Sequence, residues 1–175
     1  MKFTQTFLPL VLALGATAGP TRVVRNLASI ESAISAIQSA VVVLDTTEKA
    51  YTGGNPSALQ IASNAVVTAT NAGTATANAS GGLSDLDALS LVSPIQTLTT
   101  DVQDAVNDLI AKKSAIVAAG AETQILANLI QQNSSATALA NAITAKIPAV
   151  LQSTAASLSA GITNAIEQGI TAFSN

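Results

Sequence analysis

Three aspartates are spaced so that their carboxylates share one face of an expected helix. Asp101, Asp104 and Asp108 fall at positions i, i+3 and i+7, and residues at this spacing lie above one another on a helix. Carboxylates grouped in this way can bind a hard cation or serve as a general acid and base. They flank an apolar stripe instead of joining it, however, and Asp108 precedes Lys112 by four residues. We therefore interpret them as a solvated helix face.

The absence of two residue types excludes several kinds of catalytic and metal-binding site. The 175 residues include no cysteine and no histidine, which excludes a Ser-His-Asp triad, a thiolate nucleophile and a zinc site of the usual ligands. Asp85 and Asp87 are typical of a helix start, where carboxylates favour the positive end of the dipole, and no calcium-loop spacing follows them. We expect a protein that is not an enzyme and that binds no cofactor or metal.

The charge pattern argues against nucleic acid as a partner. The formal net charge is −3, and charged residues make up 10% of the chain. A nucleic-acid-binding domain carries a clustered basic surface, whereas the only adjacent basic residues here are Lys112 and Lys113. This pair is typical of a helix end, where cations lie near the negative pole of the dipole.

Apolar residues repeat at helical spacing along most of the chain, which predicts the elements that position these side chains. The clearest stripe alternates steps of four and three and ends before the break at Tyr51–Gly54. Asn55 and Pro56 then read as an N-cap followed by proline in the first turn of a second helix. The first stripe comprises Val23, Leu27, Ile30, Ile34, Ile37, Val41 and Leu44.

The second half of the chain predicts further helices separated by breaks. We expect a loop over residues 73–82, which contain three glycines, and a capping box at Ser84 and Asp87. The pattern restarts at Ser93-Pro94 and is interrupted at Gly120. It predicts another helix from Leu126 to Ile147 and then a last helix with Pro148 in its first turn. No alternation of period two suggests a sheet. The predicted fold is all-α, a single bundle of about five amphipathic helices without disulfides.

The first eighteen residues have the features of a secretory signal peptide. Lys2 precedes an apolar run over residues 7–14, and Ala16-Thr17-Ala18 fits the small-x-small cleavage rule. The run is shorter than the roughly 18 residues that a membrane anchor needs, and we expect no transmembrane segment. We predict cleavage between Ala18 and Gly19, a signal peptide at 1–18 and one domain at 19–175. The protein is then secreted and extracellular, and its core must be stabilised by burial alone.

Two sequons are compatible with export. Asn78 and Asn133 each begin an Asn-X-Ser pattern, whereas the proline after Asn55 excludes a third. We predict N-glycosylation at both, with Asn78 placed in the expected loop. No apolar tail follows Phe173, so we expect no lipid anchor at the carboxyl end.

Stripes built from Ala, Leu, Ile and Val leave three interpretations of the bundle. Such helices form readily but interlock weakly, so the bundle could open and adsorb to an apolar surface. Transfer of about 1,000 Å² at ~25 cal/mol per Å² would contribute about 25 kcal/mol, more than a typical folding stability of about 5–15 kcal/mol. The same helices could instead enclose an acyl chain, or form an ordinary alanine-rich core. We expect a monomer whose bundle lining includes Leu98, Val102, Val106, Leu109, Leu126, Leu129, Leu151, Leu158 and Ile162.

The order of these segments resembles the fungal hydrophobic surface-binding protein A family, which includes cell-wall galactomannoproteins. The resemblance extends over the mature chain, from RVVRNLASIESAISAIQSAV onward. Its most specific part is the succession of DLIAKKSAIVAAG, ILANLI and ALANAITAKIPAVLQSTAASLSAGITNAIEQGITAF. These segments contain the Lys112-Lys113 pair, Gly120 and the Lys146-Ile147-Pro148 turn.

The resemblance implies a secreted glycoprotein that adsorbs to hydrophobic surfaces or polyesters and helps a secreted hydrolase, such as an esterase or cutinase, reach an insoluble substrate. As alternatives, it implies a carrier that binds a fatty acid inside the helical bundle, or a cell-wall mannoprotein. Wall proteins of this kind can carry a Ser/Thr-rich stalk, whereas this sequence stops after its last helix. We therefore expect release into the medium, with wall association as the alternative.

Overall fold

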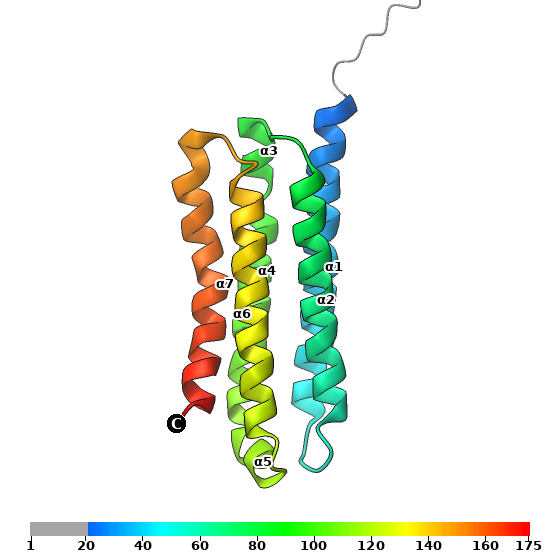
Figure 1. The fold of residues 1–175 in the computed structure, drawn as a ribbon, viewed down its shortest axis with the longest axis vertical. Helices are drawn as coiled ribbons and strands as arrows, with labels where there is room; N and C mark the ends of the chain where they lie inside the picture. The colour runs from blue at the N-terminus through cyan, green and yellow to red at the C-terminus, as the bar shows by residue number, and fades with distance from the viewer. Residues whose placement is uncertain (1–20) are drawn as a thin grey trace, which may run out of the picture.

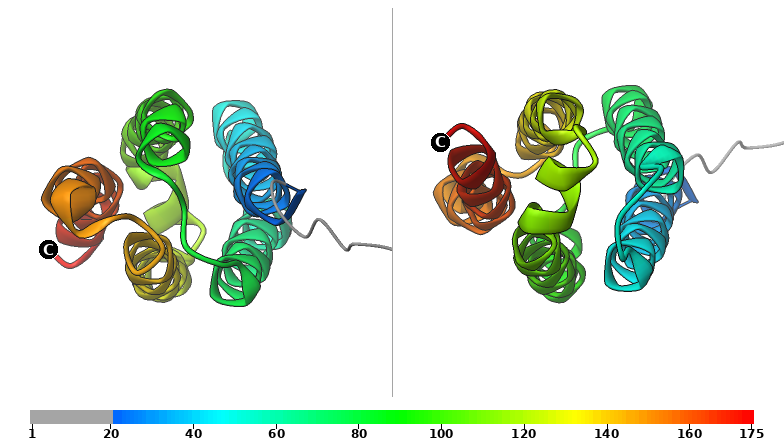
Figure 2. Two further views of the ribbon diagram at one scale, coloured as in Figure 1. Left: turned by 90° about the horizontal axis from the view of Figure 1, so that it is seen from above. Right: turned by 90° about the horizontal axis from the view of Figure 1, so that it is seen from below.

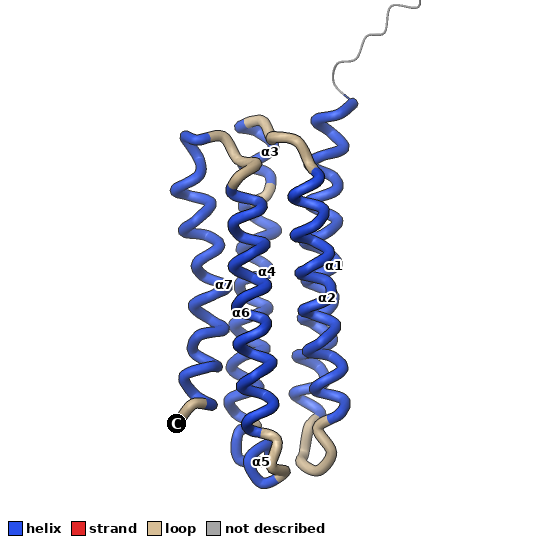
Figure 3. The backbone as a smooth tube through the Cα atoms, viewed as in Figure 1, coloured by secondary structure: helices blue, strands red, loops and turns tan. Residues whose placement is uncertain are grey.

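The computed structural model describes the backbone of residues 21–175 and side chains from residue 26 onward. The predicted signal peptide and its cleavage site at Ala18 and Gly19 lie outside the described residues. The described chain forms five long helices, two helices of six residues and one 3-10 turn, with no strand (Figure 1, Figure 3). The elements are α1 (Thr21–Ala50), α2 (Ser57–Ala79), α3 (Asp85–Ser90), α4 (Val92–Ala111), α5 (Lys113–Ala118), α6 (Glu122–Thr144), η1 (Ala149–Leu151) and α7 (Gln152–Phe173). The predicted all-α bundle of about five helices is confirmed.

The five long helices are arranged as a ring. Helix α1 packs against α2 and α4, α2 also packs against α6, and α7 packs against both α6 and α4. The views along the bundle show the five helix ends around a common centre (Figure 2). Helices α1, α4 and α7 run in one direction and α2 and α6 in the other (Figure 1). Each long helix therefore presents one face to two neighbours and to the space between them.

The described part of the stripe predicted for the first helix, from Leu27 to Leu44, faces this common core, whereas the side chain of Val23 lies outside the described residues. Ile30, Ile34, Ile37 and Val41 are all at most 3% exposed, and the helical repeat places them on one side of α1. Within the described chain, Asn26–Ala50 is also the one helical stretch long and apolar enough to cross a membrane, with a mean hydropathy of 1.7. In the bundle, one face of this stretch is buried against α2 and α4.

Local capping groups set the helix boundaries where the sequence indicates them. Gly53 and Gly54 adopt φ angles of +114° and +84°, which side chains with a Cβ rarely adopt, and they turn the chain between α1 and α2. The Oδ1 atom of Asn55 then accepts a hydrogen bond of 2.9 Å from the backbone N–H of Ser57. The predicted capping box between Ser84 and Asp87 is present at the start of α3. These ends are therefore specified locally.

Three predicted boundaries are wrong. The N-cap of α2 is Pro56 and not Asn55 as predicted, and it makes no side-chain cap hydrogen bond. The expected loop at 73–82 is helical as far as Ala79. A Cβ on Gly73 would lie 3.1 Å from Cδ1 of Ile37 and 3.4 Å from Cδ1 of Leu139, so this glycine lets α2 approach α1 and α6, and packing overrides its low helix propensity. Pro148 lies outside α7, because its ψ of 142° is extended and a 3-10 turn follows it.

Substitution of Leu91 tests the tightness of the junction between α3 and α4. Leu91 is 0% exposed, whereas Leu86 in the preceding helix is 77% exposed. We expect Leu91→Ala to lower the free energy of unfolding by about 2–5 kcal/mol, because it removes buried methyl groups and leaves a void. The control Leu86→Ala should change it by less than about 0.5 kcal/mol. Equal effects of the two substitutions in urea denaturation would contradict the described junction.

Candidate binding cavity

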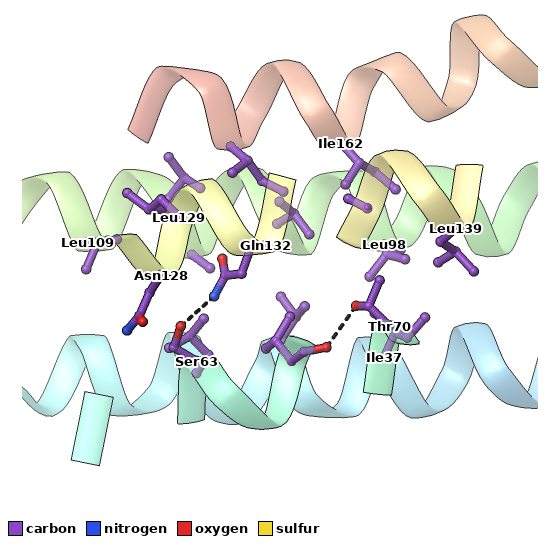
Figure 4. A pocket seen from close by; sticks show the side chains of 18 of the residues that line it. Ile37, Ser63, Thr70, Leu98, Leu109, Asn128, Leu129, Gln132, Leu139 and Ile162 are labelled. Atoms are coloured by element: carbon purple, nitrogen blue, oxygen red, sulfur yellow. Dashed lines mark hydrogen bonds between the residues drawn. The ribbon is translucent and has the colours of Figure 1, made fainter. Parts of the chain in front are cut away.

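A cavity lies inside the ring, and all five long helices contribute to its walls. The space between its lining atoms is about 1040 Å³, a figure that includes space open to solvent. Its walls are mostly aliphatic (Figure 4). The space enclosed by the inner faces of the five long helices is therefore mainly apolar.

The length of the cavity follows from the helix positions that line it. On α1 the lining extends from Ile34 to Glu48, and on α4 from Ile95 to Leu109. At 1.5 Å per residue, each stretch spans roughly 21 Å. An extended hydrocarbon advances roughly 1.25 Å per carbon, given C–C bonds of about 1.52 Å. The cavity therefore matches an extended chain of roughly 16 carbons.

The space stays open because its walls carry no bulky side chain. No aromatic residue lines the cavity, and Ala105, Ala136 and Ala140 are among the lining residues. The two aromatic residues of the described chain are used elsewhere: the hydroxyl of Tyr51 donates to the backbone oxygen of Gly54, and Phe173 is buried near the end of α7. The side chains that line the ring therefore leave space at its centre.

Polar lining residues gather toward the end of the cavity where α1 ends and α6 begins. There the Nε2 atom of Gln132 donates a hydrogen bond of 2.8 Å to Oγ of Ser63, and Asn128 lies beside this pair (Figure 4). Toward the other end, the hydroxyl of Thr70 donates to the backbone oxygen of Val66 in its own helix. The two ends of the cavity therefore differ in polarity.

Glu48 is the only titratable residue among the lining residues. It is 2% exposed, and its Oε2 atom has no hydrogen-bond partner in the protein. Burial raises the pKa of its carboxyl to about 9, with further increases from the charges of Asp45 and Asp108 and an opposing effect of Lys49. Glu48 is therefore protonated and uncharged at neutral pH.

The nearby lysine points away from the cavity and is engaged with other acids. Nζ of Lys49 lies 2.6 Å from Oδ2 of Asp45 and 3.4 Å from Oδ2 of Asp108. The predicted pairing of Asp108 with Lys112 is therefore replaced by a pair with Lys49, while Lys112 donates to the backbone oxygen of Lys49 at 2.9 Å. The end of α1 thus receives a cation, as its dipole favours.

Of the remaining residues of the two charged motifs, Asp101 and Lys113 have partners in the protein, and Asp104 is exposed. Oδ2 of Asp101 accepts a hydrogen bond of 2.8 Å from Gln38. In the described chain, no group of acidic residues is close enough to hold a metal ion. Nζ of Lys113 donates to the backbone oxygen of Ala172 at 2.6 Å, so this lysine caps the end of α7.

The structure distributes the nine predicted lining residues over three environments. Leu151 and Leu158 line a smaller pocket between α3, α4 and α7, and Leu126 packs partly buried against the core. The other six border the large cavity: Leu98, Val102, Val106, Leu109, Leu129 and Ile162. Glu48 was not predicted as a lining residue. Its position nevertheless continues the stripe of Ile37, Val41 and Leu44 by a further step of four residues.

The two sequons lie on helices. Asn78 is exposed on the last turn of α2, not in a loop as expected. Asn133 is half-buried in the middle of α6, and its Oδ1 atom is buried without a hydrogen-bond partner. Glycosylation of both residues remains a prediction, with Asn78 the more accessible acceptor.

Comparison with known proteins identifies relatives of both the sequence and the fold. A family model described as hydrophobic surface binding protein A matches residues 27–145. Cell wall mannoprotein 1 of Aspergillus fumigatus is 42% identical over 173 residues, which cover 99% of this chain and 60% of the relative. Its counterpart in Aspergillus flavus is 40% identical, with 99% and 63% covered. The chain thus spans about 60% of the length of these curated relatives.

Solved structures of similar fold contain bound fatty acids. Ligand binding domain 1 of the Penicillium marneffei MP1 protein, complexed with arachidonic acids, is 30% identical with a TM-score of 0.84, covering 86% of this chain and 100% of that one. AFMP4P in complex with palmitic acid is 26% identical with a TM-score of 0.80, covering 84% of this chain and 99% of that one.

The buried carboxyl predicts that stability depends on pH through Glu48. The folded state keeps this proton up to a pKa of about 9, whereas the unfolded chain releases it near the ordinary value of 4.5. Between these values the folded state binds more protons, so the contribution of Glu48 to the free energy of unfolding falls as pH rises, by about 1.4 kcal/mol per pH unit.

Urea denaturation of the wild type and Glu48→Gln at about pH 6 and about pH 8 measures this linkage. We expect the wild type to lose stability relative to Glu48→Gln across this interval. Glu167→Gln, at an exposed position of α7, controls for the substitution itself. The difference in free energy of unfolding between the wild type and Glu48→Gln should therefore change with pH. A difference that stays constant would show that Glu48 ionises in the folded state.

Proposed function

Because the chain belongs to the hydrophobic surface binding protein A family, we propose that it is a lipid-binding protein whose cavity holds the acyl chain of a fatty acid. The observation that carries this proposal is the aliphatic cavity inside the five-helix ring, whose length suits an extended chain. Arachidonic acids in the MP1 domain and palmitic acid in AFMP4P support the same class of ligand for a fold of this kind.

The energy of burying an acyl chain is sufficient for specific binding. Each methylene moved out of water contributes about 0.8 kcal/mol, so about 14 buried methylenes contribute roughly 11 kcal/mol. Association costs at least about 4 kcal/mol, because the ligand loses translational and rotational freedom. The remaining favourable free energy of about 7 kcal/mol corresponds to a Kd in the range of about 1–10 µM.

The residue types around the cavity favour binding without catalysis. The walls carry one carboxyl, a few hydroxyls and two amides, and the whole sequence has neither histidine nor cysteine. A hydrolase needs an activated nucleophile with a base to accept its proton, and the cavity offers no such pair. We therefore infer a non-enzymatic binding role.

The curated relatives support a location outside the cell. They are named cell wall mannoproteins, and residues 1–18 have the composition of a signal peptide. We propose that the domain at 19–175 acts as a secreted monomer, either free or associated with the cell wall.

Adsorption to hydrophobic surfaces is a second candidate function, and a patch at one end of the bundle favours it. Leu86 and Val150 are 77% and 78% exposed, and Leu89 is 53% exposed. Leu89 of α3 and Leu151 of η1 line the same small pocket, so these exposed side chains belong to neighbouring elements. We define Leu86, Leu89 and Val150 as the end patch. Recruitment of a secreted esterase or cutinase to polyesters stays a prediction of the family resemblance.

Narrowing the cavity tests the binding proposal. Ala136 on α6 lines the cavity, whereas Ala138 on the same helix is exposed. We expect Ala136→Phe to weaken binding of a fluorescent fatty acid by about tenfold or more, because the ring occupies space that the chain needs. The matched control Ala138→Phe should bind as the wild type does. No saturable uptake by delipidated wild-type protein would refute fatty-acid binding.

Replacement of the end patch tests adsorption separately. We expect the triple variant Leu86→Ser, Leu89→Ser and Val150→Ser to be depleted less by polystyrene beads while it keeps its affinity for fatty acid, because it removes only exposed apolar area. Ile61→Ser, at a 70% exposed position near the start of α2, is the control. If fatty acid suppresses adsorption of the wild type, the cavity and the adsorbing surface are coupled. Unchanged depletion of the triple variant would exclude the end patch as the adsorbing surface.

A further inference from the structure

Two polar atoms without partners mark one end of the cavity. They are Oε2 of Glu48 and Nδ2 of Asn128, both buried and neither hydrogen-bonded within the protein, and both residues line the cavity. Glu48 lies two residues before the end of α1, and Asn128 lies six residues after the start of α6. These helix ends are at the same end of the bundle (Figure 1). Buried polar groups without partners destabilise the protein, so a ligand that satisfies them gains affinity.

The cations described at this end are already engaged with other groups of the protein. Lys49 at the end of α1 contacts Asp45 and Asp108, and Lys112, the C-cap of α4, donates to a backbone oxygen. Helix α2 contains no charged residue. The single acid of α6, Glu122, lies 3.6 Å from Lys113. The groups close to Glu48 are therefore acidic or already paired.

This arrangement disfavours an ionised head group. A carboxylate moved from water into the cavity would lose its hydration and gain no cationic partner. It would also lie in the field of Asp45 and Asp108, whose charges already raise the pKa of Glu48. An uncharged hydroxyl or protonated carboxyl avoids this cost, and it can donate to Oε2 of Glu48 or accept from Nδ2 of Asn128.

We propose that Glu48 and Asn128 form a head-group site for uncharged lipids, so that the cavity selects long-chain primary alcohols and protonated fatty acids over fatty-acid anions. This inference rests on the proposed acyl-chain binding and specifies which head group accompanies the chain. The aliphatic tail then extends along the cavity toward Ile95 and Thr70 at the far end.

The proposal predicts that the affinity for a fatty acid depends on pH. A free fatty acid has the ordinary carboxyl pKa of about 4–5, so above this value it must take up a proton to bind. Its apparent affinity then falls about tenfold for each pH unit. The affinity of the corresponding alcohol stays constant, because burial keeps Glu48 protonated up to its pKa of about 9.

The experiment compares 1-dodecanol with dodecanoic acid on delipidated full-length mature protein, by displacement of a neutral fluorescent probe at about pH 5.5, about 6.5 and about 7.5. We expect the Kd of the alcohol to vary by less than about twofold and that of the acid to rise about 100-fold over the series. Both ligands are used below their aggregation thresholds. Equal and pH-independent affinities of the two ligands would overturn the proposal, because the head group would then lie in solvent.

Variants at the two residues locate the site. Asn128→Leu and Glu48→Leu should each weaken binding of the alcohol by about 5–10-fold, since each removes a hydrogen-bond partner. Glu48→Gln should bind it within about threefold of the wild type, because the amide also donates and accepts. The control Thr68→Val changes an exposed hydroxyl on α2 that is bonded to its own helix and lies outside the cavity, and it should leave the Kd unchanged. Wild-type affinity in both leucine variants would overturn the proposed site, whereas failure of both ligands to bind the wild type would refute acyl-chain binding itself.

Discussion

The structure depends on one packing constraint: five helices form a ring whose inner faces carry mostly small and medium aliphatic side chains and no aromatic ring. Packing of α7 against α4 and α6 closes the ring. Gly169 brings α7 close to both neighbours, because a Cβ there would lie 3.3 Å from Leu129 and from Val106. The helices thus touch at the seams while their inner side chains do not meet at the centre. The cavity is a consequence of the number of helices and the size of these side chains.

The cavity and its polar groups lower the stability of the empty protein. An apolar void costs about 20 cal/mol per Å² of its surface, and a buried polar atom without a partner costs about 1–3 kcal/mol. Without disulfides, this cost is offset only by the tightly packed seams and by the buried stripes such as Ile30 to Val41. A bound acyl chain would replace contacts that the protein cannot make with itself, which ties the proposed function to the energetics of the fold.

The sequence predicted those features that depend on local patterns. The stripe of α1, the turn at Gly53 and Gly54 and the capping box at Ser84 follow from spacing and from residue type, and all were correct. The helical character of Gly73 could not be predicted in this way, because it follows from contacts with Ile37 and Leu139, which are distant in sequence. For the same reason the stripes indicated which faces are buried but could not distinguish a filled core from a cavity. Glu48 was missed because a glutamate is normally assigned to solvent, although its position continues the apolar stripe.

The two ends of the bundle have opposite chemical character, and this relates the two candidate functions. Glu48, Asn128 and the hydrogen-bonded pair of Ser63 and Gln132 are grouped toward one end. The other end carries the end patch and the small pocket, which shares Ile95 with the large cavity. A lipid whose head group lies at Glu48 would direct its tail toward the patch. An apolar surface that contacts the patch would then lie beside the tail of the bound lipid, and not beside its head group. Adsorption and lipid binding would therefore use neighbouring surfaces of one molecule without competing for the same residues.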